Sequence, residues 1–114
     1  MNTSSLAGHV GFPGASVYAV SKWGVIGLTK TAALEFARQG VRVNSVSPGP
    51  IQTEMFDRAF EGQSDLEKAI EAENPIGRIG TPEEIASVVL WLSSPGAAFT
   101  TGQDIVVDGG FSAQ

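Results

Sequence analysis

The sequence predicts an α/β fold in which parallel strands alternate with helices. Three observations indicate this class. A run rich in β-branched residues, 41–47, follows a long helical segment and is stopped by Pro48 and Gly49. A second such run, 103–108, follows another helical segment and is turned by two glycines. Short strands that alternate with helices of this length are typical of βαβ units and a parallel sheet.

The first strand and the first helix occupy the N-terminal third. Residues 1–4 are expected to end a strand, and the Gly/Pro-rich segment that follows to form a loop in which His9 has no partner. Ser16 is expected to cap a helix that runs to about Arg38, and Gly40 to end that helix. Apolar residues spread around this helix, so we expect it to be buried on more than one side.

The middle of the chain, residues 54–75, differs in character because it is rich in acidic residues. The run Ser64-Asp65-Leu66-Glu67 is expected to form a capping box that opens a short helix. A solvated helical surface would explain the charge. A mobile lid over a substrate is the alternative. The apolar residues that would face such a substrate are Met55, Phe56, Phe60, Leu66 and Ile70.

The run Thr81-Pro82-Glu83-Glu84 predicts the start of the last long helix. The threonine caps, the proline takes the first helical position, and Glu84 completes a capping box. This helix lies between the strands 41–47 and 103–108, so we expect a right-handed crossover. Asp108, at the end of the second strand, is expected to cap the turn that follows.

Composition argues against several classes of function. The net charge is -5 and no basic patch occurs, which argues against nucleic-acid binding. No apolar run is long enough to span a membrane. The chain has no cysteine and one histidine, so we expect no disulfide and no metal site. We expect a cytoplasmic protein.

Tyr18, Lys22 and Ser5 are the residues most indicative of chemistry. A tyrosine and a lysine four residues apart lie on the same face of a helix. A positive charge beside a phenol favours the phenolate, so Tyr18 could exchange a proton near neutral pH. Ser5 adds a hydroxyl that could hold the oxygen being protonated. The pattern predicts proton transfer for an alcohol or ketone; the alternative is a half-buried Tyr18 with a solvated lysine neighbour.

Four motifs resemble those of the short-chain dehydrogenase/reductase family. They are Asn2-Thr3-Ser4-Ser5, Tyr18-Ala-Val-Ser-Lys22, Arg42 to Gly49, and Gly102 to Gly110, in the family's order and at its spacings. The resemblance covers essentially all 114 residues. It implies the C-terminal part of a doubly wound parallel-sheet Rossmann-type fold, and one partial domain over residues 1–114.

The resemblance also implies roles for single residues. Tyr18 would donate or accept the proton, Lys22 would stabilise the ionised phenol and bind the nicotinamide ribose, and Ser5 would hold the substrate oxygen. The segment 48–53 resembles the family's loop that closes on the nicotinamide, here called the cofactor loop. The residues expected to bind the cofactor are Tyr18, Lys22, Pro48, Gly49, Ile51 through its backbone and Thr53 through its hydroxyl.

Other family features are missing from these residues. No glycine-rich phosphate-binding turn occurs near the start, and neither does the residue that would select NAD or NADP. We therefore expect the N-terminal dinucleotide-binding half to be lacking. We also expect exposed apolar surface where the rest of the sheet would pack.

Three functions follow from these expectations. The first is an oxidoreductase that transfers a hydride between NAD or NADP and a secondary alcohol or ketone, with residues 54–76 as a substrate lid. The second is a truncated, non-catalytic fragment that associates with a full-length subunit. The third is an isomerase or epimerase that uses the same Tyr/Lys pair with a retained cofactor. The resemblance further implies a homo-oligomer, a dimer or tetramer, formed through the Tyr18 helix and the C-terminal helix. Gly24 and Gly27 would allow a second helix to approach closely.

Overall fold

The computed structural model describes all 114 residues, which form three strands, four α-helices and four short 3-10 helices. The strands and α-helices are β1 (Asn2–Thr3), α1 (Ser16–Phe36), β2 (Ser45–Pro48), α2 (Glu54–Ala59), α3 (Ser64–Glu73), α4 (Pro82–Leu92) and β3 (Asp104–Val107). The 3-10 helices are η1 (Leu6–Gly8), η2 (Ala37–Gln39), η3 (Pro95–Ala97) and η4 (Phe111–Ala113).

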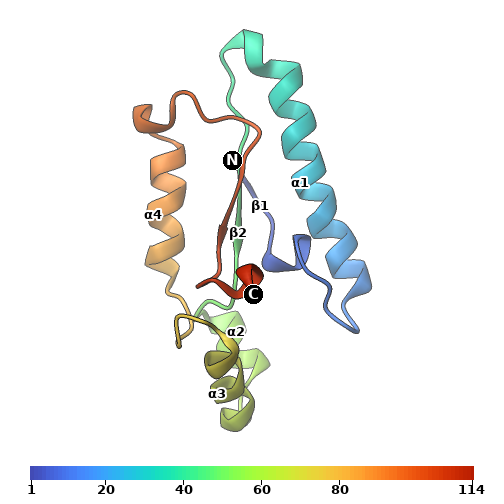
Figure 1. Ribbon diagram of the computed structural model, residues 1–114, viewed down its shortest axis with the longest axis vertical. Helices are drawn as coiled ribbons and strands as arrows, with labels where there is room; N and C mark the ends of the chain where they lie inside the picture. The colour runs from blue at the N-terminus through green and yellow to red at the C-terminus, as the bar shows by residue number, and fades with distance from the viewer.

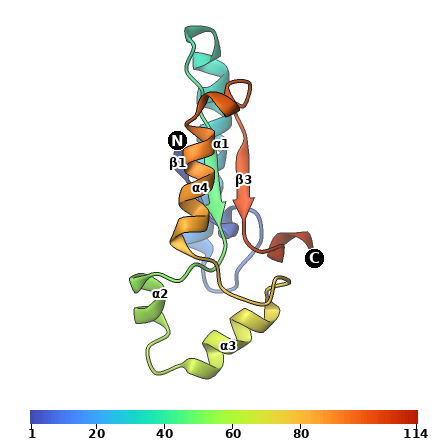
Figure 2. The same ribbon diagram turned by 90° about the vertical axis from the view of Figure 1, so that its left-hand side faces the viewer.

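The strands form one parallel sheet in the order β1-β2-β3, which confirms the expected class. Figure 1 views this sheet nearly edge-on, with α4 and α1 on its two sides. Ser45 pairs with Asn2 on one side and with Asp104 on the other. Helices α1 and α4 cover opposite faces of the sheet. Helices α2 and α3 lie beyond the carboxyl ends of the strands (Figure 2). This is the edge at which ligands bind in open α/β sheets.

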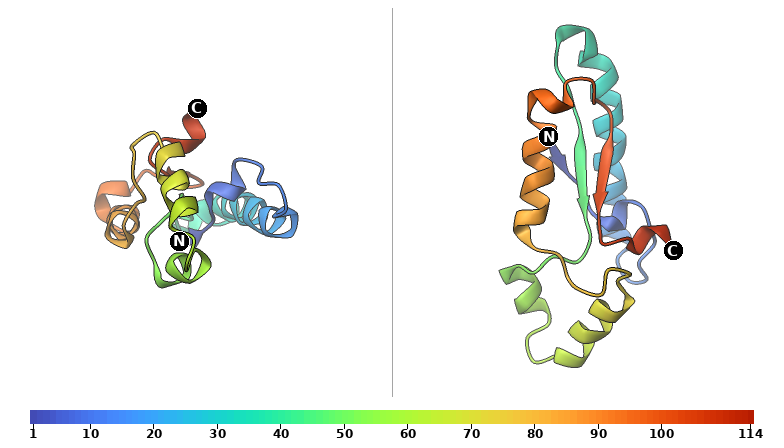
Figure 3. Two further views of the ribbon diagram at one scale, coloured as in Figure 1. Left: turned by 90° about the horizontal axis from the view of Figure 1, so that it is seen from below. Right: turned by 60° about the vertical axis from the view of Figure 1, so that its left-hand side comes forward.

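The two crossovers have opposite hands. The strands follow one another in a single direction across the sheet, whereas α1 and α4 lie on opposite faces (Figure 3). The crossover through α1 is right-handed, so the one through α4 is left-handed and the expected right-handed crossover is wrong. The preference for right-handed crossovers arises when a right-twisted strand leads directly into the helix that packs back on the sheet. Here α2 and α3 intervene, and the chain reaches the other face of the sheet before α4 begins.

The helix starts were predicted correctly at one position and wrongly at two. Thr81 forms the expected capping box with Glu84. Ser16 and Ser64 are instead the first helical residues, and Ala15 and Gln63 precede them without any side-chain capping bond. The expected helix end is confirmed, because Gly40 adopts the left-handed conformation at φ 75° after η2.

Helix α1 is less buried than its composition predicts. Only Thr29 and Ala33 are buried, while Val17, Val20, Leu28 and Leu34 are more than half exposed. An added Cβ at Gly24 or Gly27 would meet nothing within 4 Å, so no helix of this chain approaches there. The expected burial on more than one side is therefore wrong for residues 1–114 by themselves.

The exposed apolar surface that we expected is present. Only 15 of the 114 residues are buried, and Trp23, Trp91 and Phe99 are among the exposed large side chains. The radius of gyration is 15.3 Å, compared with about 13 Å for a compact domain of this length. The apolar faces of α1 and α4 thus lack a covering partner within the described residues. No helix is long and apolar enough to cross a membrane.

His9 has a partner, contrary to expectation. Its Nε2 lies 2.6 Å from Oδ2 of Asp104, whose side chain is only 4% exposed. Ser45 donates a hydrogen bond to the other carboxylate oxygen of Asp104. The three residues join the loop after η1 to the starts of β2 and β3. A buried carboxylate requires such partners.

Candidate active site

Every residue predicted to take part in catalysis or cofactor binding lines a single cavity of about 670 Å³. The cavity opens at the carboxyl edge of the sheet, between the end of β1, helix α1, the cofactor loop and α2. The predicted residues are Ser5, Tyr18, Lys22, Pro48, Gly49, Ile51 and Thr53. We call it the first cavity.

Tyr18 and Lys22 lie side by side on the first turns of α1. The Lys22 Nζ is 5.5 Å from the centroid of the Tyr18 ring. It also donates a hydrogen bond to the carbonyl of Thr3 at 3.4 Å, at the end of β1. A cation over an aromatic ring at this distance is attracted to the face of the ring. Tyr18 lines the cavity and is 50% exposed within this chain.

The hydroxyl groups of Ser5 and Thr53 have the same local arrangement. Ser5 Oγ accepts a hydrogen bond from the Ala7 N–H at 3.2 Å, which caps η1. Thr53 Oγ1 accepts one from the Phe56 N–H at 3.2 Å, which caps α2. In both cases the oxygen serves the backbone as acceptor, so the O–H proton remains available for a ligand. The sequence did not predict either capping role.

Ile51 presents its backbone to the cavity for a simple topological reason. It pairs with Gly80 in an isolated parallel bridge. The two bonds of this bridge run from Gly80 N–H to the Pro50 carbonyl at 3.0 Å and from Gln52 N–H to the Gly80 carbonyl at 2.9 Å. The N–H and C=O of Ile51 itself take part in no hydrogen bond and can serve a ligand.

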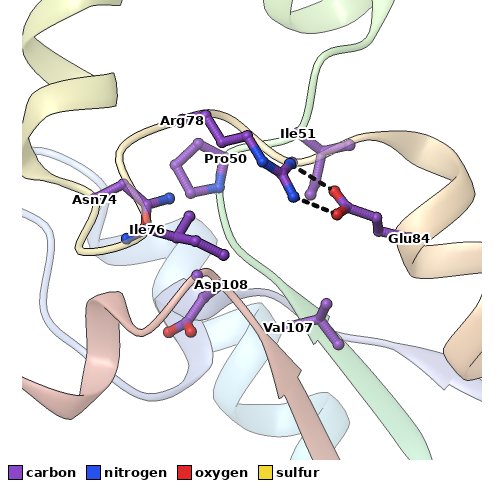
Figure 4. A pocket seen from close by; sticks show the side chains of 10 residues that line it. Pro50, Ile51, Asn74, Ile76, Arg78, Glu84, Val107 and Asp108 are labelled. Atoms are coloured by element: carbon purple, nitrogen blue, oxygen red, sulfur yellow. Dashed lines mark hydrogen bonds and ion pairs between the residues drawn. The ribbon is translucent and has the colours of Figure 1, made fainter.

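An ion pair supports the far side of the cofactor loop. Arg78 contacts both carboxylate oxygens of Glu84, at 2.9 and 2.5 Å, beside a cavity of about 140 Å³ (Figure 4). Hydrogen bonds from Arg78, and then from the Thr81 backbone, lower the pKa of Glu84 to about 2. The same carboxylate therefore caps α4 and holds Arg78 next to the Ile51–Gly80 bridge. Sequence analysis found the capping box but not the ion pair.

The end of β3 approaches the cofactor loop closely. Gly49 donates a hydrogen bond to the Val107 carbonyl at 2.9 Å. Asp108 accepts hydrogen bonds from the backbone N–H groups of Gly110 and Ser112, at 2.9 and 2.8 Å, as its predicted role in the turn requires. Burial opposes its ionisation, but the hydrogen bonds from Ser112 and Gly110 prevail and lower its pKa.

A second cavity, of about 480 Å³, adjoins the first and shares Ser5 and Tyr18 with it. Phe56 and Phe60 line both cavities, Ile70 lines the second, and Met55 lines the first. Leu66 lines neither cavity. Phe12 also lines the second cavity. It belongs to the loop before α1, for which the sequence predicted no site residue. No three potential metal ligands lie together anywhere in the chain.

Comparison with known proteins decides the family. A family model described as enoyl-(acyl carrier protein) reductase matches residues 1–112. The chain is also 46% identical over 114 residues to cyclohexanol dehydrogenase of Acinetobacter sp. strain SE19. The chain belongs to the short-chain dehydrogenase/reductase family.

Other relatives support the same assignment. A 2,5-dichloro-2,5-cyclohexadiene-1,4-diol dehydrogenase of Sphingobium indicum is 42% identical over 113 residues, which are 99% of this chain and 45% of that protein. The match to cyclohexanol dehydrogenase covers 100% of this chain and 43% of that protein. The chain thus spans less than half the length of these relatives.

Solved structures give the same result in three dimensions. A 4-hydroxyisoleucine dehydrogenase complexed with NADH superposes with a TM-score of 0.93 at 38% identity, over 99% of this chain and 46% of that one. The structure of ElxO with NADP bound superposes with a TM-score of 0.91 at 37% identity, and the match covers 99% of this chain and 46% of ElxO. The fold is therefore the C-terminal part of a Rossmann-type short-chain dehydrogenase, as expected.

Proposed function

We propose that residues 1–114 form the catalytic half of an NAD(P)-dependent oxidoreductase acting on a secondary alcohol or its ketone. The observation that carries the proposal is the position of the Lys22 ammonium beside the Tyr18 ring, in a cavity that also contains the Ser5 hydroxyl. The names of relatives, including cyclohexanol dehydrogenase, support an alcohol as the substrate.

Each of the three residues has a distinct part in the proposed reaction. The Ser5 O–H donates a hydrogen bond to the substrate oxygen, since Ser5 Oγ already accepts from Ala7. The Tyr18 hydroxyl gives its proton to that oxygen when a ketone is reduced and accepts it when an alcohol is oxidised. Lys22 stabilises the phenolate that forms on Tyr18, and its bond to Thr3 holds the ammonium at the end of β1.

The residues of the cofactor loop fit a nicotinamide. The N–H and C=O of Ile51 can bind the two functional groups of a carboxamide, and the Thr53 O–H is a further donor. Lys22, which lines the same cavity, would bind a ribose hydroxyl. When bound, the nicotinamide supplies or accepts the hydride. Structural neighbours with NADH and with NADP support either dinucleotide.

Two further features belong to this proposal. Residues 54–76 act as a lid, since α2 and α3 stand over the carboxyl edge of the sheet and contribute Phe56, Phe60 and Ile70 to its cavities. The exposed apolar faces of α1 and α4, with Trp23 and Trp91, support association into a homo-oligomer.

The test replaces Tyr18 by phenylalanine in the complete enzyme. Tyr18→Phe should remove most turnover while leaving dinucleotide affinity nearly intact, because only the exchanging proton is lost. Val17→Ala is a matched control, since Val17 is adjacent on α1 and 84% exposed. Steady-state turnover and dinucleotide titration provide the two readouts. Equal turnover in Tyr18→Phe and the parent would refute the role of Tyr18.

A non-catalytic fragment that associates with a full-length subunit is the second candidate. The extensive exposed apolar surface of α1 and α4 favours it. Dinucleotide binding by the isolated chain separates the two candidates. Micromolar affinity together with turnover would contradict the fragment hypothesis.

A further inference from the structure

The two adjoining cavities differ in the chemistry of their walls. The residues that line both cavities lie at the boundary between them, and they are Ser5, Tyr18, Pro48, Gly49, Pro50, Phe56 and Phe60. Only the first cavity contains Lys22, Ile51 and Thr53, the groups proposed to bind the nicotinamide and its ribose. The second cavity extends from the same boundary toward the loop before α1 and the helix α3.

No charged side chain lines the second cavity. Its walls include Leu6, Phe12, Phe60 and Ile70, and its only polar side chains are Ser5 and Tyr18. A charged group placed against these apolar walls would lose part of its hydration without gaining an ionic partner, which is unfavourable. A carbonyl or hydroxyl directed at Ser5 and Tyr18 would be hydrogen-bonded.

We propose that the substrate is an uncharged, mainly apolar ketone or secondary alcohol whose hydrocarbon part occupies the second cavity. This inference rests on the proposed oxidoreductase function and deepens it. The oxygen of the substrate is its one polar atom within the cavity, and it meets Ser5 and Tyr18. The hydrocarbon part contacts Phe12 from one side and Phe60 and Ile70 of the lid from the other.

The aromatic contacts around the cavity support a preformed apolar wall. The rings of Phe56 and Phe60 are 4.5 Å apart between centroids, so successive turns of the chain at α2 present one aromatic surface. Phe12 stacks on Phe111 of η4 with centroids 6.4 Å apart. The C-terminal segment thereby supports the loop that carries Phe12. At about 480 Å³ the cavity is of ordinary size for a small-molecule ligand.

Phe12 and Ile70 determine specificity in this arrangement, because they line the second cavity and not the first. Ile70 is the better residue to change, since it lies on helix α3, which has no buried residue. A positive charge introduced there would give a carboxylate the partner that the native cavity lacks.

The experiment compares two ketones that differ by one carboxylate, cyclohexanone and 4-oxocyclohexanecarboxylate. The complete enzyme is assayed for oxidation of NADH and NADPH with each. We expect the parent to prefer cyclohexanone by about a hundredfold in kcat/KM. Ile70→Arg should reduce this ratio at least about tenfold. Leu66→Arg adds the same charge to the same helix at a residue outside both cavities, and should leave the ratio unchanged.

The possible outcomes separate the inference from the function on which it depends. Turnover of the carboxylate equal to that of cyclohexanone would overturn the inference while the oxidoreductase function stands. An unchanged ratio in Ile70→Arg, or an equal shift in Leu66→Arg, would also overturn it. Absence of dinucleotide oxidation with both ketones and with a broader panel of charged carbonyl compounds would refute the proposed function itself.

Discussion

Gly49 is the position at which a single methyl group should cause the greatest damage to the proposed cofactor site. A Cβ built on Gly49 would lie 2.7 Å from Cα and 2.8 Å from Cβ of Asp108. Both contacts involve or adjoin the backbone, so no side-chain rotation relieves them. Favourable contacts between carbon atoms begin near 3.5 Å. Gly49→Ala therefore requires the cofactor loop and the end of β3 to separate by nearly 1 Å.

The expected loss of stability in Gly49→Ala follows from the hydrogen bond and packing that this separation disturbs. The Gly49 N–H to Val107 carbonyl bond of 2.9 Å lies at the same contact. Overpacking of a close contact costs about 1–3 kcal/mol of stability. A displacement of about 1 Å at a site that positions reactants can reduce turnover about a hundredfold. We expect both effects, because Ile51 and Thr53 follow Gly49 directly in the chain.

The assay measures stability and kinetics of Gly49→Ala in the complete enzyme. Denaturant titration should show a loss of about 1–3 kcal/mol. The KM for dinucleotide should rise more than the KM for ketone. Gly11→Ala is the matched control, because a Cβ at Gly11 would meet nothing within 4 Å. Unchanged dinucleotide KM in Gly49→Ala, with Gly11→Ala also unchanged, would show that the loop does not depend on this close approach.

Two further predictions concern the helix that supports the cofactor loop. Hydrogen bonds from Arg78 and Thr81 lower the pKa of Glu84 in the folded chain to about 2, below its ordinary value. The ionised carboxylate therefore contributes stability above the unfolded pKa, and this contribution is lost as the pH falls toward 2. The denaturation midpoints of the parent and of Glu84→Gln should therefore converge as the pH falls toward 2. Glu83 forms no ion pair with an arginine, so the difference between the parent and Glu83→Gln should show no comparable pH dependence. Leu92→Ala should cost about 2–5 kcal/mol in denaturant titration, because Leu92 is 2% exposed. Leu90→Ala should cost little because Leu90 is 71% exposed, and equal losses in both variants would contradict the described packing of α4.

Features that depend on one helix or one turn were predictable from the sequence. Tyr18 and Lys22 lie together because four residues make about one helical turn. The box between Thr81 and Glu84 requires only the first turn of α4. Ser64 shows the limit of such patterns. The Gln63 carbonyl already accepts hydrogen bonds from Leu66 and Glu67, both at 3.1 Å, so Gln63 takes the cap position and Ser64 becomes the first helical residue.

Features that join distant segments could not be predicted in this way. His9 and Asp104 are 95 positions apart, and no local pattern relates them. The same is true of the Ile51–Gly80 bridge, which leaves the Ile51 backbone free for a ligand. The left-handed crossover also depends on a distant effect, because α2 and α3 carry the chain across the carboxyl edge before α4. Sequence patterns therefore predicted residues that line the first cavity, but not the contacts that orient the cofactor loop.

The burial of α1 connects the stability of this chain with its proposed chemistry. The helix is apolar on several sides, yet Leu28 and Leu34 are 62% and 83% exposed. The same helix carries Tyr18 and Lys22, and its position is fixed mainly by η1 and by the short strands β1 and β2. A sheet of three short strands provides a small core, and covering the remaining apolar faces of α1 would stabilise it. The partner proposed to cover these faces would therefore also stabilise the helix that carries Tyr18 and Lys22.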